Sequence, residues 1–203
     1  PLITSYALAP AKTLTVDGDT FAYRELGPRE DVPVIFFVHL AATLDNWDPR
    51  IVDAIARTRR VITFDQLGVG ASSGRVPDTL EEAVDDARYD PKEFLFFNRD
   101  AAGKKAGKAF VERLKELTVD RDEPMKNAGF TRQLKAIVRY GRSAPSDLSV
   151  ITQPTLIANG DNDRMVPSVL SEDLHRRIAG SRVIIYPNSG HGGVFQYWEQ
   201  FAP

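Results

Sequence analysis

Four short runs of apolar and β-branched residues limit the folds that this 203-residue chain can adopt. They are residues 33–40 (PVIFFVHL), 60–64 (RVITF), 154–158 (PTLIA) and 182–186 (RVIIY). Runs that do not alternate between apolar and polar residues predict strands buried on both faces, as in a parallel sheet. Segments with helical signals separate the runs, so the sequence predicts an α/β fold with a mostly parallel sheet.

The N-terminal part of the chain predicts a hairpin beside that sheet. Residues 13–16 and 21–25 alternate in polarity, and the turn residues Asp17, Gly18 and Asp19 separate them. Two alternating runs joined by a short turn of this composition are typical of antiparallel strands.

Helical signals fill the middle of the chain. Helices are predicted over residues 48–56, from Asp78 with a capping box to Glu81, and over residues 101–117, 127–142 and 167–178. In the fourth of these, Phe130, Leu134, Ile137 and Val138 share one face. We therefore expect three segments: an N-terminal part of the α/β core (1–88), a helical cap (89–147) and a C-terminal part of the core (148–203).

Composition excludes several classes of function. The net charge of −2 lacks the basic footprint of a nucleic-acid-binding protein, and the absence of cysteine excludes disulfides, thiolate metal sites and a cysteine nucleophile. No apolar run reaches the length of a membrane span, and no signal peptide is visible, so we expect a cytoplasmic protein without a membrane partner. Because Pro1 is not Met and Pro203 follows the predicted start of a helix, we expect trimmed ends.

Polar residues follow the predicted strands at their carboxyl ends, where open α/β sheets bind ligands. Asp163 follows the third run and His191 follows the fourth, in a glycine-rich loop. An acid and then a histidine in this order match the later half of a Ser…Asp…His triad. Asp161 is the alternative acid, and we interpret it as a turn residue.

Four segments carry a family resemblance: residues 39–41 (HLA), 64–72 (FDQLGVGAS), 160–167 (GDNDRMVP) and 190–192 (GHG). Together they resemble the α/β-hydrolase family, in its esterase, non-haem haloperoxidase-like and perhydrolase-like branch. The resemblance extends over nearly the whole chain. Two residues depart from the family pattern, because Leu40 stands where a glycine is usual and Leu67 where an arginine is common.

The resemblance implies acyl transfer on a small-molecule ester substrate, with no cofactor and no metal. His191 would be the general base, and Asp163 would orient it. Backbone N–H groups near Leu40 and Ala41 would hold the oxyanion. His39, Trp47 and Phe97 are expected to contact the substrate, with packing in the core as the alternative for each. The sequence leaves a homo-oligomer open.

A serine nucleophile is harder to find. The one formal match to Gly-x-Ser-x-Gly places Ser72 between Gly70 and Gly74, too far beyond the strand that ends near Phe64 and not followed by a helix. We interpret Ser72 as a loop residue. A Rossmann glycine pattern in the same loop fails, because Pro77 interrupts any helix after it.

The strand–elbow–helix units of the family are missing after about Arg88, a deficit of roughly 60 residues. Either an internal stretch has been removed from the sequence, or the chain is a deletion variant that closes its sheet without those units. In the second case the strand over residues 154–158 should pair directly with the strand over residues 33–39. The alternative function is a catalytically inactive variant or pseudoenzyme that binds small molecules, serves as a scaffold or is completed by a partner chain.

Overall fold

A computed structural model describes residues 5–29, 32–74 and 91–202 of the chain. These residues form two compact units, which are described separately. The first contains the described residues up to 74 together with Arg113–Ser143. The second contains those from 91 to Glu112 together with Ala144–Phe201.

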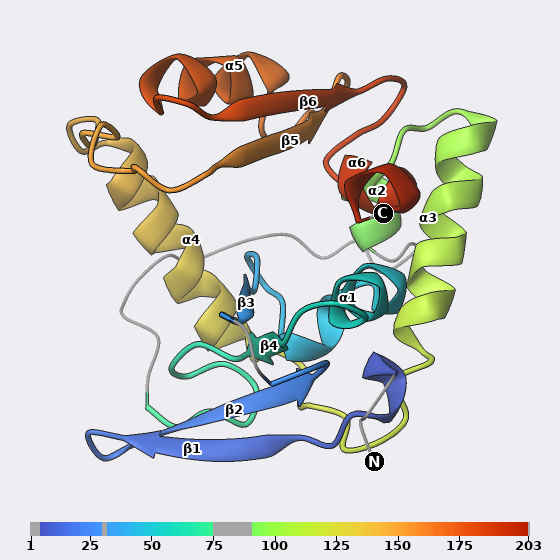
Figure 1. The fold of residues 1–203 in the computed structure, drawn as a ribbon, viewed down its shortest axis with the longest axis vertical. Helices are drawn as coiled ribbons and strands as arrows, with labels where there is room; N and C mark the ends of the chain where they lie inside the picture. Colours follow the sequence, from blue (N-terminus) through green and yellow to red (C-terminus); the bar gives the residue numbers. More distant parts are fainter. Residues whose placement is uncertain (1–4, 30–31, 75–90, 203) are drawn as a thin grey trace. The chain divides into compact units, whose positions relative to one another are not determined.

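A four-stranded sheet organises the first unit (Figure 1). Its strands are β1 (Lys12–Val16), β2 (Asp19–Leu26), β3 (Val34–Phe37) and β4 (Val61–Phe64), in the order β1-β2-β4-β3. The predicted hairpin is confirmed, since β1 and β2 pair antiparallel. Asp17 (φ 52°) and Gly18 (φ 89°) turn the chain between them in the left-handed region that such tight turns require. β3 and β4 pair in parallel, as their uninterrupted apolar sequences predicted.

Short helices complete the core of the first unit. They are η1 (Tyr6–Leu8), η2 (Leu44–Asn46) and α1 (Pro49–Ala56). α1 begins as predicted, with Pro49 in its first turn and the Asp48 carboxylate accepting from the backbone N–H of Arg50. Ile51 and Val52 on its inner face are fully buried.

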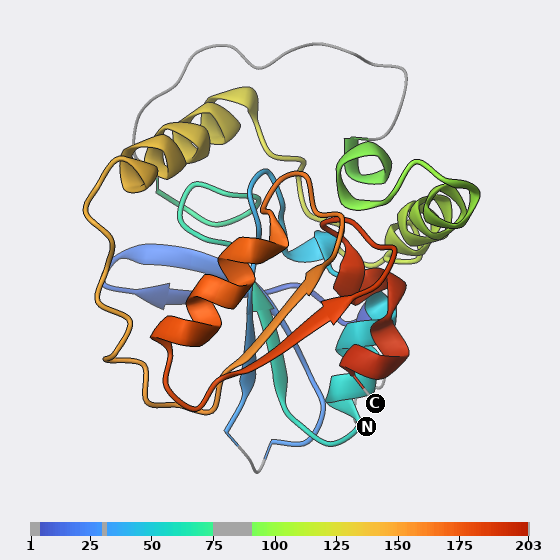
Figure 2. The ribbon, with the colours of Figure 1, turned by 90° about the horizontal axis from the view of Figure 1, so that it is seen from above.

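A parallel pair of strands organises the second unit. β5 (Leu156–Gly160) pairs with β6 (Arg182–Tyr186), and α5 (Ser168–Arg177) packs along both strands (Figure 2). Two short helices, α6 (Gly193–Gln196) and α7 (Trp198–Phe201), follow β6. The carboxyl ends of β5 and β6 therefore lie side by side, which places the loops that carry Asp161, Asp163 and His191 together.

Three helices occupy the segment predicted as a cap. They are α2 (Pro91–Phe96), α3 (Ala101–Leu114) and α4 (Asn127–Gly141), and the predicted helices over 101–117 and 127–142 match the last two closely. α4 buries none of its residues, and Ile137 and Val138 of its apolar face are about half exposed. The division at residues 88/89 and 147/148 stays a prediction.

The expected pairing between the first and third apolar runs is wrong. Among the described residues, β3 pairs with β4 alone and β5 with β6 alone, in separate sheets. Each pair lies within one compact unit, and the described helices of the connection between β4 and β5 are divided between the two units. In the described parts of that connection, residues 65–74 and 91–155, no strand occurs.

The helix predicted from Asp78 and the gap after Arg88 lie outside the described residues. In the ranges that the structure covers, no helix has the length and apolar character to cross a membrane.

Candidate active site

Asp163 and His191 meet at the carboxyl ends of β5 and β6. The Nδ1 atom of His191 lies 2.8 Å from Oδ2 of Asp163. Asp163 is 6% exposed, whereas the His191 side chain is 28% exposed and so remains reachable from solvent. A carboxylate accepts and does not donate, so His191 must carry its proton on Nδ1, which leaves Nε2 as a base.

The loop between β5 and α5, residues 161–167, is called the acid loop, and its backbone fixes the Asp163 side chain. Its other oxygen, Oδ1, accepts hydrogen bonds from the backbone N–H groups of Met165 (2.8 Å) and Val166 (2.9 Å). One oxygen therefore holds the turn that leads into α5, and the other is left to orient the histidine. This division explains why an aspartate suits the position, because its short side chain reaches both partners.

The loop between β6 and α6, residues 187–192, is called the histidine loop, and it packs closely against α2. The backbone carbonyl of Phe96 accepts a 2.6 Å hydrogen bond from the N–H of Gly192, and a side chain at Gly190 or Gly192 would press on Phe96. The Phe96 ring lies 5.3 Å from the His191 ring, centroid to centroid. Phe96 thus holds the loop through its backbone carbonyl, and its ring packs against the imidazole of His191.

Asp161 ties the acid loop to the histidine loop. Its carboxylate accepts from the backbone N–H groups of Asn188 (2.9 Å) and Ser189 (3.1 Å). The bond from the Asn188 N–H lowers the pKa of Asp161 because it favours the charged carboxylate. These contacts agree with the interpretation of Asp161 as a turn residue, since it contacts backbone and not His191.

Ser72 serves the structure of the first unit. Its hydroxyl accepts from the N–H of Ala22 and donates to the carbonyl of Asp65, each at 2.9 Å. The side chain is nearly buried, at 9% exposed. Both hydrogen bonds join the glycine-rich loop to β2 and β4, as expected of a loop serine.

The predicted oxyanion-hole donor already has a partner. Ala41 has a left-handed backbone conformation, with φ 62°, and its N–H donates to the side-chain oxygen of Gln133 at 2.8 Å. The carbonyl of Leu40 contacts the ring nitrogen Nδ1 of His39 at 2.8 Å. Gln133 lies 92 residues beyond Ala41 in sequence, so no local pattern could have pointed to it.

The residues predicted to contact the substrate belong to both compact units. Phe97 is 2% exposed and packs against Phe110, with ring centroids 5.6 Å apart, so it belongs to the core of the second unit. Trp47 and His39 belong to the first unit, where Trp47 packs edge-on against Phe36. Of the residues predicted for catalysis in the second unit, Asp163 and His191 are in direct contact.

Within the ranges that the structure describes, no group of three or more His, Cys, Asp or Glu side chains is arranged to hold a metal ion.

Comparisons of sequence give short matches. No family model matches the chain. A non-heme chloroperoxidase of Streptomyces lividans is 34% identical over 58 residues, and the AB hydrolase superfamily protein YisY of Bacillus subtilis is 37% identical over 54 residues. The matches include 29% and 27% of this chain and cover only about a fifth of those relatives' own lengths, 21% and 20%.

Comparisons of structure extend over nearly the whole chain. An alpha/beta hydrolase fold protein from Chitinophaga pinensis superposes with a TM-score of 0.88 at 28% identity, over 97% of this chain and 95% of that one. The enol-lactonase from Burkholderia xenovorans LB400 gives a TM-score of 0.68 at 16% identity, over 94% of this chain and 96% of that one. An acid and a histidine at adjacent strand ends accompany this similarity, and the chain therefore has the α/β-hydrolase fold.

Proposed function

We propose that the chain carries the acid–base half of an ester-hydrolysing site and acts in acyl transfer on small carboxylic esters. The observation that supports this is the 2.8 Å contact between His191 and Asp163, with Asp163 held by two backbone N–H groups. Among the structural neighbours are an enol-lactonase and a thermophilic esterase from Thermogutta terrifontis, both hydrolases of ester bonds by their names.

In this proposal His191 moves the proton in both halves of the reaction. Its Nε2 takes the proton of the attacking hydroxyl as the new bond to the ester carbonyl carbon forms. It then returns that proton to the departing alkoxide when the carbon–oxygen bond breaks. Asp163 stabilises the imidazolium that exists between these steps.

The attacking hydroxyl has two sources. In a form that contains the strand–elbow–helix unit it is a serine outside the present sequence. In the present 203 residues the attacking group is a water molecule. Ser72, the one formal match to the elbow pattern, does not serve, because its hydroxyl accepts from the N–H of Ala22 and donates to the carbonyl of Asp65. Within the described residues of the second unit, no serine or threonine hydroxyl hydrogen-bonds His191.

The test is hydrolysis of p-nitrophenyl acetate by the 203-residue chain. His191→Ala should lower the protein-dependent rate by about 10²- to 10⁴-fold, the range for loss of a general base. The matched control is His175→Ala, on α5, whose ring contacts Ser181 at 2.9 Å and which should keep the rate. A fluorophosphonate probe should leave the chain unlabelled. A rate that does not depend on His191 would refute the proposal.

A second candidate is a binding protein without catalytic activity. It is favoured by the Ala41 N–H, which donates to Gln133 and so is occupied in this conformation. Under this alternative, the purified chain would bind an ester analogue with the same affinity before and after His191→Ala, and neither form would hydrolyse esters.

A further inference from the structure

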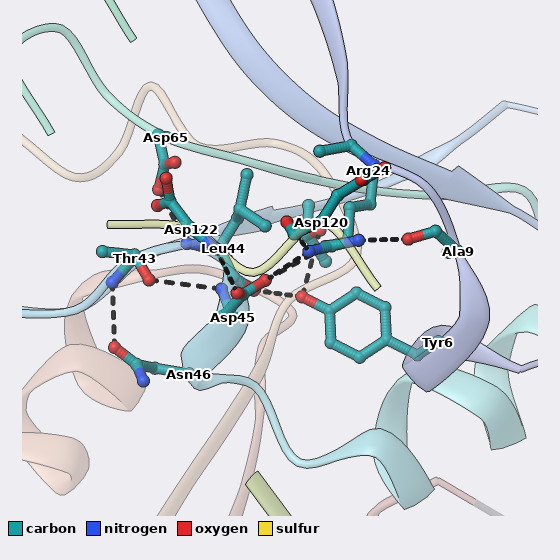
Figure 3. A network of polar contacts seen from close by, with 12 residues as sticks. Tyr6, Ala9, Arg24, Thr43, Leu44, Asp45, Asn46, Asp65, Asp120 and Asp122 are labelled. Carbon is teal, nitrogen blue, oxygen red and sulfur yellow. Dashed lines mark hydrogen bonds and ion pairs between the residues drawn. The ribbon is translucent and has the colours of Figure 1, made fainter. Parts of the chain in front are cut away.

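Two buried carboxyl groups in the first unit face one another without a donor between them. Asp65, at the end of β4, is 0% exposed, and Asp122 lies in the connection between α3 and α4. Figure 3 shows their side chains pointing toward each other. Their Oδ2 atoms converge beside Gly70, where a β-carbon would overlap both of them.

Three of the four carboxyl oxygens of Asp65 and Asp122 accept no hydrogen bond from the described residues. Asp65 Oδ1 accepts from the N–H of Leu44 at 2.7 Å. Asp65 Oδ2 and both oxygens of Asp122 are buried, and no donor of the described residues reaches them. Two ionised carboxylates cannot bond to each other, but a carboxylate and a carboxylic acid can, because the acid supplies one O–H.

We propose that Asp65 and Asp122 share one proton, and that this proton fastens the α3–α4 connection to the end of β4 and is lost in alkaline solution. The proposal is independent of ester hydrolysis, because Asp65 and Asp122 belong to the first unit and the Asp163–His191 pair belongs to the second.

Other contacts bring the connection to this place. The N–H of Asp122 donates to Asp45 at 2.7 Å, and the carbonyl of Asp120 accepts from Arg24 at 2.6 Å. The Asp120 carboxylate also accepts from the N–H of Ala11 at 3.2 Å. These bonds hold the backbone of the connection beside Asp65 whatever the charge of Asp122. In this arrangement a shared proton removes the repulsion between the two carboxylates.

Several titratable groups surround the pair (Figure 3). Asp45 of η2 adds negative charge, but the fully buried Arg24 of β2 pairs with it at 2.9 Å. The Tyr6 hydroxyl of η1 donates to the carbonyl of Leu44 and also contacts the hydroxyl of Thr63. Burial raises the pKa of Tyr6, so its hydroxyl stays neutral. Arg24 is thus matched by Asp45. Arg121 and Glu123, one cation and one anion, line the pocket beside Asp122.

Burial and the neighbouring Asp122 raise the pKa of Asp65 from 3.8 to about 9. The folded protein therefore holds a proton between pH 4 and pH 9 that the unfolded chain has released. Stability from this group is complete below pH 4 and falls as the pH rises toward 9. A pocket of about 240 Å³ lined by Gly70 and Asp122 borders the pair and gives solvent a route for proton exchange.

The first experiment compares unfolding at a series of pH values in the full chain and in Asp122→Asn. The side-chain amide of the variant can donate to Asp65, so no shared proton is needed. From pH 5 to pH 8 the unfolding constant of the first unit should rise by about tenfold per pH unit more in the parent than in the variant. Glu123→Gln removes an exposed carboxylate of the same connection and should behave as the parent does. Parallel curves for the parent and Asp122→Asn would overturn the proposal.

The second experiment needs no stable variant. Infrared spectra of the folded parent protein should show the carbonyl band of one protonated carboxylic acid at pH 7, disappearing near pH 9. The band should be absent from Asp122→Asn and Asp65→Asn and present in Glu123→Gln. A parent protein with no protonated carboxyl at pH 7 would overturn the proposal even if both variants failed to fold.

Discussion

At the residue scale, Asp163 shows how one side chain serves both fold and chemistry. Its Oδ1 closes the turn before α5 by accepting from two backbone N–H groups, and its Oδ2 orients His191. Because the carboxylate is fixed by backbone atoms, the histidine that contacts it is also fixed in its ring orientation and tautomer. The two roles can be separated by a substitution that keeps one acceptor oxygen.

Asp163→Asn makes that separation. The amide oxygen can still accept from Met165 and Val166, so the free energy of unfolding should change by no more than about 1 kcal/mol. The amide nitrogen would then face His191 Nδ1, which turns the imidazole to the wrong tautomer. Hydrolysis of p-nitrophenyl acetate should fall by about 10²- to 10⁴-fold, as measured in the steady state. An equally active variant would show that Asp163 does not orient the base.

Ser72→Ala tests whether the Ser72 hydroxyl has a structural role and no catalytic role. The substitution leaves the N–H of Ala22 and the carbonyl of Asp65 without a partner in a buried place, which should cost about 1–3 kcal/mol. Urea denaturation measures this loss, and Ser146→Ala, on an exposed loop, is the control expected to cost almost nothing. The ester-hydrolysis rate of folded Ser72→Ala should be unchanged. A loss of rate without a loss of stability would make Ser72 the nucleophile after all.

The sequence allowed some of these contacts to be predicted and not others. Asp163 and His191 could be paired because each follows a strand directly, and parallel strands end at the same edge of a sheet. Asp65 and Asp122 are 57 positions apart, and Asp122 lies in a connection without periodicity. Nothing in its local sequence indicates which strand end it will meet.

At the element scale, local pattern predicted most of the strands and helices and the β1–β2 hairpin, but not which of the buried strands pair. The runs at β3 and β5 have the same apolar character, and either could in principle accept a parallel neighbour. Pairing depends on where the connections carry the strands, and the residues of a strand do not by themselves indicate this. The direct pairing of β3 with β5 was therefore predicted wrongly although both strands were found.

Gly160, the last residue of β5, sets how closely this strand approaches the histidine loop. A β-carbon there would overlap the backbone carbonyls of Ser189 and Gly190, which cannot move without moving His191. Gly160→Ala should cost about 1–3 kcal/mol in the free energy of unfolding, and the NMR signal of the His191 Nδ1 proton should shift or broaden. Gly141→Ala is the control, because no atom lies within 4 Å of its added β-carbon. An unchanged His191 signal in Gly160→Ala would mean that the loop is not held by this approach.

At the scale of the whole molecule, each compact unit has its own hydrogen-bonded sheet and its own buried side chains. Ile51 of α1 is fully buried in the first unit, and Ile157 of β5 is 8% exposed in the second. Truncating either to alanine removes the same atoms and should cost about 2–5 kcal/mol. If the units unfold separately, each substitution will destabilise only its own unit.

Hydrogen exchange followed by mass spectrometry distinguishes the units, because peptides from β4 report on the first and peptides from β6 on the second. Ile51→Ala should speed exchange in β4 and leave β6 protected, and Ile157→Ala should do the reverse. The Asp65–Asp122 pair allows a second comparison. When the pH is raised from 5 to 8, exchange in β4 should accelerate more than the intrinsic exchange rate does. Exchange in β6 should accelerate only as much as the intrinsic rate. Loss of protection in both strands after either substitution would mean that the two units unfold as one. In that case, loss of the shared proton at alkaline pH would also lower the stability of the unit that carries Asp163 and His191.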